Sequence, residues 1–451
     1  ISQGSGANIT ILNGQVKAIY SDGAGSGAAM VDAFTDLAAA SLFVDGDLAS
    51  NTAGTSNFRA GVNAGNSITS GGNYNVVVGD EAGTALTTGD NNVAIGYAAL
   101  DLEDTGTDSV AVGYNALTAQ NNDAANHNVA VGSSAGAAIT TGTENTLLGG
   151  LAGTALTTGI RSVLLGYQAG DALTEGQENI AVGKSALSAD TLGSRATAIG
   201  KSALSSQNFT TATQNYNVAV GYEAGKAVTT GTKNTLLGGL AGDAFTTGSD
   251  NVALGYNALT ADTLGSRSTA LGRSTLQNQN FTTATNAYNV AIGYAAGDAV
   301  TTGIRNNLFG AEAGEALTDA DDNIAIGYQA LTSDTLGSRS VAIGNNALDA
   351  QNFTTATQTY NVAVGYAAGG AVTTGVKNTF VGGLAGDAYN TSNNNVAVGY
   401  AALSSDTKGT KNVAVGFEAL LDQNQTTNTD VYNVAVGYHA GTNVTVGTIN
   451  T

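Results

Sequence analysis

The amino-acid sequence predicts an all-β fold, a parallel β-solenoid of about 21 coils, and three observations predict it. A short apolar segment followed by glycine, first complete as Asn75-Val-Val-Val-Gly79, recurs 21 times, mostly at 17-residue spacing. The chain of 451 residues contains no proline, where an average composition would give roughly 23. No segment shows the apolar stripe of a helix, and a long hydrogen-bonded ladder is the structure that least tolerates a missing backbone N–H.

The chain is expected to divide into an N-terminal attachment region, residues 1–57, and a repeat shaft, residues 58–451. A partial unit, Gly61-Val-Asn-Ala-Gly65, indicates that the array begins near Phe58. From Gly149 onward the glycine spacing runs 17, 17, 17, 21 and repeats, which gives a 72-residue super-repeat of four coils. Helical repeats need about 30 residues or more, so a 17-residue unit is one turn of a solenoid whose strands stack about 4.8 Å apart.

A glycine closes each strand. We expect it to supply a corner with positive φ, or a close approach between backbones, because glycine alone has no Cβ to prevent either. These corner glycines include Gly79, Gly96, Gly113, Gly149, Gly221, Gly293, Gly365 and Gly437.

The three positions before each corner glycine are apolar on both faces of the strand. Positions three and one before the glycine are mostly Val, Ile or Leu, and we expect them to point into the coil. The middle position should then face outward; it is Ala in most coils and larger in others. A strand that is apolar on both faces is normally buried on both, which predicts an obligate parallel homo-oligomer, and cyclic symmetry favours a homotrimer. The alternative is a monomer with an Ala-rich surface. The larger residues expected at the oligomer interface are Leu147, Leu164, Leu236, Leu308 and Phe380.

The 21-residue coils carry four extra residues, and these place aromatic side chains in a loop every 72 residues. Such loops would form an evenly spaced row along one edge of the rod, where exposed aromatic residues commonly bind glycans or proteins. Alternatively, the phenylalanines fold back into the bulge or reach a neighbouring chain. The candidate surface or receptor-binding residues are Phe209, Tyr216, Phe281, Tyr288, Phe353 and Tyr360.

A charged hexapeptide precedes these loops. The sequence Asp190-Thr-Leu-Gly-Ser-Arg195 recurs at 262–267 and 334–339. We expect each Asp to form a salt bridge with the Arg of its own loop, a surface pair worth at most about 1 kcal/mol.

Composition disfavours several classes of function. The 35 acidic and 15 basic residues give a net charge of −20, which makes nucleic acid and anionic membranes improbable partners, and no apolar run approaches the ~18 residues of a membrane span. With no Cys, and only His127 and His439, far apart in the array, the sequence offers no nucleophilic triad and no transition-metal site. We therefore expect no enzymatic activity, no catalytic residue and no cofactor.

One oxygen-rich corner at Asp319, Asp321 and Asp322 could hold calcium, with a solvated turn as the alternative.

Two resemblances add to these expectations. The recurring Asn/Ser-Val-Ala-Val/Ile-Gly motif of residues 75–451 resembles the head repeats of trimeric autotransporter adhesins of the YadA type. That resemblance implies a left-handed β-roll wound as a trimer, which serves as a rod-shaped attachment module. Residues 1–45, with Ile9-Thr-Ile-Leu-Asn-Gly and Val31-Asp-Ala-Phe34, are similar to a segment of tail-fibre-like proteins of marine bacteriophages.

Together, the resemblances imply a structural fibre of a virion, located on a phage tail or appendage, that projects toward the host cell and adheres to it. Its partners would be two further copies of the chain, other tail proteins at the N-terminal end, and a host surface glycan or protein. The alternatives are the head of a bacterial surface adhesin and a subunit of an extracellular structural filament.

Overall fold

The computed structural model describes residues 19–21, 30–32 and 53–451. The chain divides into two compact units, residues 1–51 and 52–451. In the first unit, β1 (Ile19–Ser21) pairs with β2 (Met30–Asp32) in antiparallel fashion. The expected attachment region, residues 1–57, therefore lies mostly outside the described residues.

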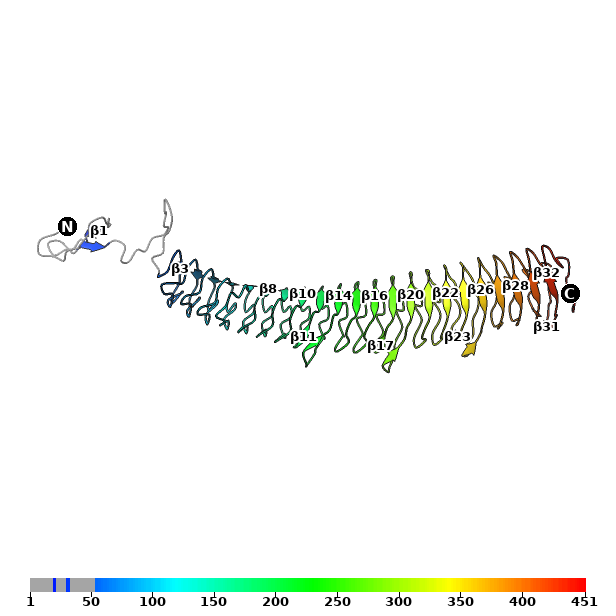
Figure 1. Cartoon of the computed structure of the whole chain (residues 1–451), viewed down its shortest axis with the longest axis horizontal. Coiled ribbons are helices and arrows are strands. Elements are labelled where there is room, and N and C mark those ends of the chain that lie inside the picture. The colour runs from blue at the N-terminus through cyan, green and yellow to red at the C-terminus, as the bar shows by residue number, and fades with distance from the viewer. Residues whose placement is uncertain (1–18, 22–29, 33–52) are drawn as a thin grey trace. The chain divides into compact units, whose positions relative to one another are not determined.

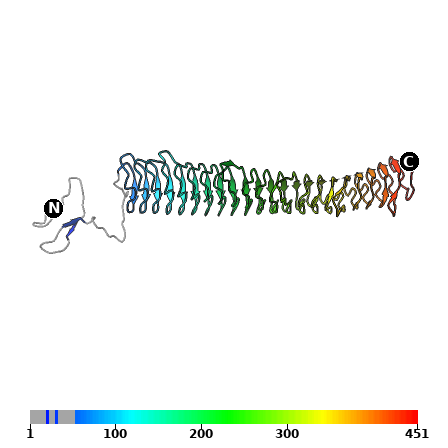
Figure 2. The same cartoon turned by 90° about the horizontal axis from the view of Figure 1, so that it is seen from below.

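The second unit is a parallel β-solenoid in which every coil adds one three-residue strand to a single ladder (Figure 1). Each strand pairs in parallel with the next one along the chain without a shift of register; Val218, for example, pairs with Thr235. Figure 2 shows the strand arrows in one continuous row along the rod. The ladder begins at Phe58, and residues 53–451 contain no helix, so the predicted solenoid is confirmed.

The 22 ladder strands are β3 (Phe58–Ala60), β4 (Val76–Val78), β5 (Val93–Ile95), β6 (Val110–Val112), β7 (Val129–Val131), β8 (Thr146–Leu148), β9 (Val163–Leu165), β10 (Ile180–Val182), β12 (Thr197–Ile199), β14 (Val218–Val220), β15 (Thr235–Leu237), β16 (Val252–Leu254), β18 (Thr269–Leu271), β20 (Val290–Ile292), β21 (Asn307–Phe309), β22 (Ile324–Ile326), β24 (Val341–Ile343), β26 (Val362–Val364), β27 (Thr379–Val381), β28 (Val396–Val398), β30 (Val413–Val415) and β32 (Val434–Val436).

Short second strands mark the 21-residue coils. In each one, a two-residue strand pairs in parallel with the corner of the coil before it, and the loop beside it projects from the rod near β11, β17 and β23 (Figure 1). These pairs are β11 (Gly193–Ser194) with β13 (Thr213–Gln214), β17 (Gly265–Ser266) with β19 (Thr285–Asn286), β23 (Gly337–Ser338) with β25 (Thr357–Gln358), and β29 (Gly409–Thr410) with β31 (Thr429–Asp430).

Two positions that vary together keep the interior volume of the coils nearly constant. Where the residue four after the corner glycine is Leu, the residue seven after it is polar and the middle strand residue is Ala. Where the fourth residue is Gly, the seventh residue is a larger apolar or aromatic one, and its side chain fills the volume that the leucine occupies in the other coils. A Cβ on Gly83 would lie 2.8 Å from Cδ1 of Leu86 and 3.3 Å from Cγ1 of Val77. Close packing of a narrow interior requires this exchange of volume.

A ladder of buried asparagines fixes the stacking of the coils. Asn234, four residues before its corner glycine, donates from Nδ2 to the carbonyl oxygen of Gly248 at 2.9 Å and accepts from the backbone N–H of Asn251 at 3.1 Å. The same two bonds recur at Asn75, whose Nδ2 bonds Gly89 and whose Oδ1 bonds the N–H of Asn92. The asparagine of the repeated motif therefore satisfies buried backbone groups that neither strand nor turn can pair.

Candidate functional site

The outward face of the ladder is largely apolar and carries no charged side chain; its polar members are Thr146, Thr197, Thr235, Thr269, Asn307 and Thr379. The residue just before each corner glycine is apolar in all 22 strands, and none of these residues is buried. Leu254 is 45% exposed and Ile326 is 38% exposed. Exposed tyrosines such as Tyr256 follow many of the glycines and border this face. Monomeric soluble proteins rarely expose contiguous apolar patches of this extent.

The expected direction of the strand side chains was wrong. The five residues assigned to the oligomer interface are fully buried inside their own coils, and the strand residues on either side of them face outward. The physical reason is the narrow interior, which accepts a large middle residue only where the residue four after the glycine is itself Gly, as the 2.9 Å approach of a Gly170 Cβ to Leu164 shows. The residues concerned are Leu147, Leu164, Leu236, Leu308 and Phe380.

All of the named corner glycines have a positive φ, and all except Gly437 also approach the backbone of the next corner closely. Gly149 has φ of 138°, and a Cβ there would lie 2.5 Å from the carbonyl oxygen of Gly166 in the next coil. Gly221 and Gly293 show the same approach to the following corner. Adjacent corners therefore stack backbone on backbone, which leaves no room for a side chain.

The two kinds of aromatic residue in the 21-residue coils have different environments. Phe209, Phe281 and Phe353 are only 4–6% exposed and fill the base of the projecting loop, so they offer little surface to a receptor. By contrast, Tyr216 and Tyr288 are 46% and 49% exposed. Tyr360 lies equally open, so only the tyrosines of this group remain candidates for binding.

The aspartate of the charged hexapeptide is not paired with the arginine of its own loop. Asp190 is fully buried and accepts hydrogen bonds from Gln207 Nε2 and from the backbone N–H groups of Gly193 and Phe209. Burial raises the pKa of this carboxyl group, and the hydrogen bonds partly oppose that shift. The expectation of a surface salt bridge was therefore wrong; Asp190 anchors the loop instead.

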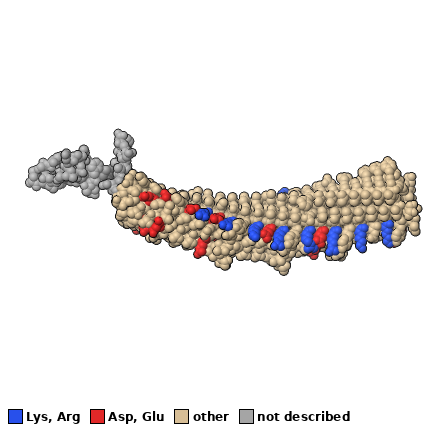
Figure 3. All heavy atoms as spheres, in the orientation of Figure 1, with Lys and Arg blue, Asp and Glu red and all other residues tan. Residues whose placement is uncertain are grey.

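The arginine of the hexapeptide belongs to a charged row along the rod. This row consists of the residues five before each corner glycine and holds eight of the 15 basic residues of the chain. Arg195 bonds Glu178 one coil earlier, with 2.7 Å between Nε and Oε2, and this contact lowers the pKa of Glu178. In Figure 3 the basic and acidic atoms form a stripe on one face. From Glu144, the row comprises Glu144, Arg161, Glu178, Arg195, Tyr216, Lys233, Asp250, Arg267, Tyr288, Arg305, Asp322, Arg339, Tyr360, Lys377, Asn394, Lys411 and Tyr432.

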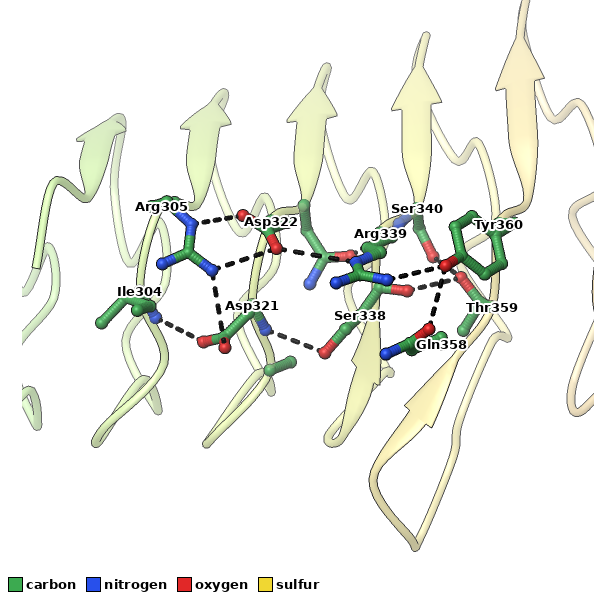
Figure 4. Close-up of polar contacts among 12 residues, drawn as sticks. Ile304, Arg305, Asp321, Asp322, Ser338, Arg339, Ser340, Gln358, Thr359 and Tyr360 are labelled. Carbon is green, nitrogen blue, oxygen red and sulfur yellow. Dashed lines mark hydrogen bonds and ion pairs between the residues drawn. The ribbon is translucent and has the colours of Figure 1, made fainter.

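Within the row, an arginine, a tyrosine and a loop residue form a repeated cluster (Figure 4). Nη1 of Arg339 donates to the hydroxyl of Tyr360 at 2.7 Å, and the guanidinium group lies 5.6 Å from the ring centroid. The Tyr360 hydroxyl in turn donates to Oε1 of Gln358 at 2.9 Å. Arg195, Tyr216 and Gln214 repeat this arrangement in the first 21-residue coil.

A surface pocket lies beside each of these two clusters. The first, of about 210 Å³, is lined by Glu178, Arg195 and Gln214 together with Gln177, Ser194, Ala212 and Thr213. The second, of about 340 Å³, is lined by Arg305, Asp319, Asp321, Asp322, Ser338, Arg339, Ala356, Thr357 and Gln358. Both are polar and open to solvent, and both occupy the same place in the super-repeat.

The remaining candidate residues are dispersed. Among residues 53–451, no three His, Cys, Asp or Glu side chains are arranged to hold a metal ion. Of the possible calcium ligands, Asp319 accepts from the hydroxyl of Thr302, Asp321 from the backbone N–H of Ile304, and Asp322 from an arginine. His439 lies 3.2 Å from Glu418 at one end of the ladder.

In the part of the chain that the structure describes, no helix has the length and apolar character needed to cross a membrane.

Comparison of the chain with protein-family models, curated proteins and solved structures gives no match.

Proposed function

We propose that the solenoid is the shaft of a structural fibre, assembled as a parallel homotrimer, and that the fibre is part of a virion appendage that adheres to a host cell. The observation that carries the proposal is the apolar outward face of the ladder. It combines an exposed row of aliphatic side chains with a regular, hydrogen-bonded rod, a combination suited to side-by-side assembly.

The size of this face supports self-association. With about 4.8 Å per strand and about 3.3 Å per residue, a face of three residues by 22 strands covers roughly 1,000 Å². A stable protein interface buries about 800 Å² per partner. Another copy of the chain has the same length and strand spacing, so it can cover the whole face in register.

The symmetry of the rod favours a parallel arrangement. Cyclic symmetry about an axis along the rod gives every copy the same surroundings and keeps equivalent coils at the same height. Neither outward strand position carries a charged side chain in any coil. Apolar side chains of the copies can therefore meet along the axis without burying an unpaired charge. The virion assignment itself rests on the sequence resemblances, and a cell-surface adhesin remains the second candidate.

Electron microscopy of the purified protein tests the fibre proposal. We expect straight rods about 100 Å long with three subunits in cross-section. The variant Leu254→Lys/Ile326→Lys, which places two charges on the apolar face, should give rods one chain thick with an unchanged circular dichroism spectrum. Wild-type rods as thin as those of the variant would contradict the proposal.

Mass spectrometry of purified virus particles and of host cell envelopes from the source culture distinguishes a virion protein from an adhesin.

A further inference from the structure

We propose that the two pockets beside the projecting loops are subsites for a neutral, hydroxyl-rich saccharide chain. The proposal rests on the fibre function, because it identifies the surface through which such a shaft would adhere. The shaft could nevertheless be a trimeric fibre without binding saccharide there, so the two proposals can fail separately.

The same side chains build both pockets at equivalent places. Ser194, Arg195 and Gln214 line the first, and Ser338, Arg339 and Gln358 line the second. Corresponding residues are 144 positions apart (339 − 195), which is two super-repeats of 72 residues or eight coils. At the strand spacing, the pockets lie about 38 Å apart along one rod.

Hydrogen bonds orient the glutamine of each pocket. In the first pocket, Oε1 of Gln214 accepts from Nη1 of Arg195 at 2.6 Å and from the hydroxyl of Tyr216 at 2.8 Å. In the second, the Tyr360 hydroxyl fixes Oε1 of Gln358. Within residues 53–451, neither Nε2 has a hydrogen-bond partner, so each pocket presents an amide donor whose direction is already set. Preorganised donors lose little freedom on binding.

The charges favour a neutral ligand over an ion. Arg195 is balanced by Glu178 at 2.7 Å. In the second pocket, Arg305 and Arg339 face three carboxylates, and the whole chain carries −20, which repels anions. A cation in the pocket would be repelled by the guanidinium groups of the lining arginines. A hydroxyl group suits the mixture, because it can donate to a carboxylate and accept from an amide or guanidinium N–H.

The other two 21-residue coils provide natural contrasts. Asn286, one methylene shorter, replaces the glutamine in the second, and no hydrogen bond joins it to Tyr288. In the fourth, Asp430 replaces it and bonds Lys411 at 2.6 Å, which leaves no amide donor. We therefore assign binding to the first and third of these coils, where two weak subsites on one rod would reinforce each other.

The test measures retention of the full chain in native gels that contain a neutral polysaccharide (dextran, mannan or galactan) or an acidic one (alginate or heparin). We expect wild type to be retarded by at least one neutral polymer and by neither acidic one. Gln214→Ala/Gln358→Ala should weaken that binding at least about tenfold, the equivalent of roughly one or two hydrogen bonds. Each single variant should lose less, because one subsite remains.

Two substitutions serve as matched controls. Gln277→Ala removes the same side chain from a surface position outside both pockets, and Asn286→Ala alters the loop of the second 21-residue coil; both should bind within about twofold of wild type, well below the effect of a lost hydrogen bond. Light scattering on every variant checks that the assembly is unchanged. The proposal is overturned if wild type binds none of the neutral polymers, if only the acidic polymers bind, or if the double variant binds like wild type.

Discussion

Gln207 donates a hydrogen bond of 2.6 Å to the carboxylate of Asp190, which lies one coil earlier and is completely buried. The Gln207 side chain also accepts from Asn217, a member of the asparagine ladder, at 2.8 Å. The pair thus joins the loop of the long coil to the core of the rod. The same contacts recur where Gln279 meets Asp262.

Removal of the glutamine should destabilise the first long coil. In Gln207→Leu, the Asp190 carboxylate loses its side-chain donor and Asn217 loses an acceptor, which should cost about 2–4 kcal/mol. Hydrogen exchange at residues 190–217 should accelerate, with little change several coils away. Gln277→Leu, at a partly exposed position, is the matched control. Equal effects of the two substitutions would show that the buried pair has no special role.

The corner glycines should differ sharply from their neighbours. Gly149→Ala places a Cβ 2.5 Å from a backbone oxygen at φ of 138°, whereas Gly150→Ala meets nothing closer than 3.6 Å and has no positive φ. We expect the first substitution to cost roughly 3 kcal/mol and the second to be neutral or slightly stabilising. Urea unfolding followed by circular dichroism measures both. A well-tolerated Gly149→Ala would contradict the backbone stacking of adjacent corners.

The two interior positions that vary together should show coupling. Gly83→Leu alone overpacks its coil, since a Cβ there already lies 2.8 Å from Cδ1 of Leu86, and should cost about 1–3 kcal/mol. Adding Leu86→Ala removes the side chain closest to the new leucine and makes room for it. Because Leu100 and Leu117 occupy the equivalent position with positive φ, the backbone accepts the change. The double variant should therefore be more stable than the sum of the single effects by at least about 1 kcal/mol. Additive effects would argue against volume exchange.

The rod should be more stable in mild acid than in mild base. Burial raises the pKa values of Asp190, Asp262, Asp171, Asp243 and Asp387. A carboxyl group whose pKa is higher in the folded chain contributes stability that is fully present below its unfolded pKa, near 3.9. That contribution is lost as the pH rises through the folded pKa. The urea midpoint should consequently be higher at about pH 4 than at about pH 8.

Salt separates this burial effect from the repulsion of net charge. Screening at about 1 M salt suppresses interactions between exposed charges but leaves the cost of a buried carboxylate. Exposed pairs with lowered pKa values, such as Glu178 with Arg195, favour the opposite trend but are half-exposed and contribute little. A midpoint that is higher at pH 8, or a pH effect that disappears in salt, would show that burial does not control the pH dependence.

Periodicity made the fold predictable, because spacing alone shows that Asn75 to Gly79 and its copies stack as one ladder. Hydrophobicity alone did not predict which strand side chains point into the coil, since the residues on both faces of the strand are mostly apolar. Val218 and Val220 have the larger side chains, yet Ala219 is the one inside, because the coil is narrow. A signal was present in the sequence: large middle residues such as Leu236 and Phe380 occur only in coils with Gly four residues after the corner.

The candidate site was predictable only in part. The super-repeat marked Tyr216 and its equivalents as a row, but the partners of Arg195 lie 17 and 21 residues away in neighbouring coils, at Glu178 and Tyr216. Local sequence suggested Asp190 instead, because it stands in the same hexapeptide. On a solenoid, a surface side chain contacts residues about one repeat length away in the sequence. Those residues lie directly above and below it in the neighbouring coils, whereas residues of the same hexapeptide can point elsewhere.

The native mass of the assembly in solution, measured by light scattering, tests the central claim most directly. The account predicts a mass of three chains for wild type and of one chain for the folded Leu254→Lys/Ile326→Lys variant. A soluble wild-type monomer that leaves the apolar face of the ladder open to water would contradict it.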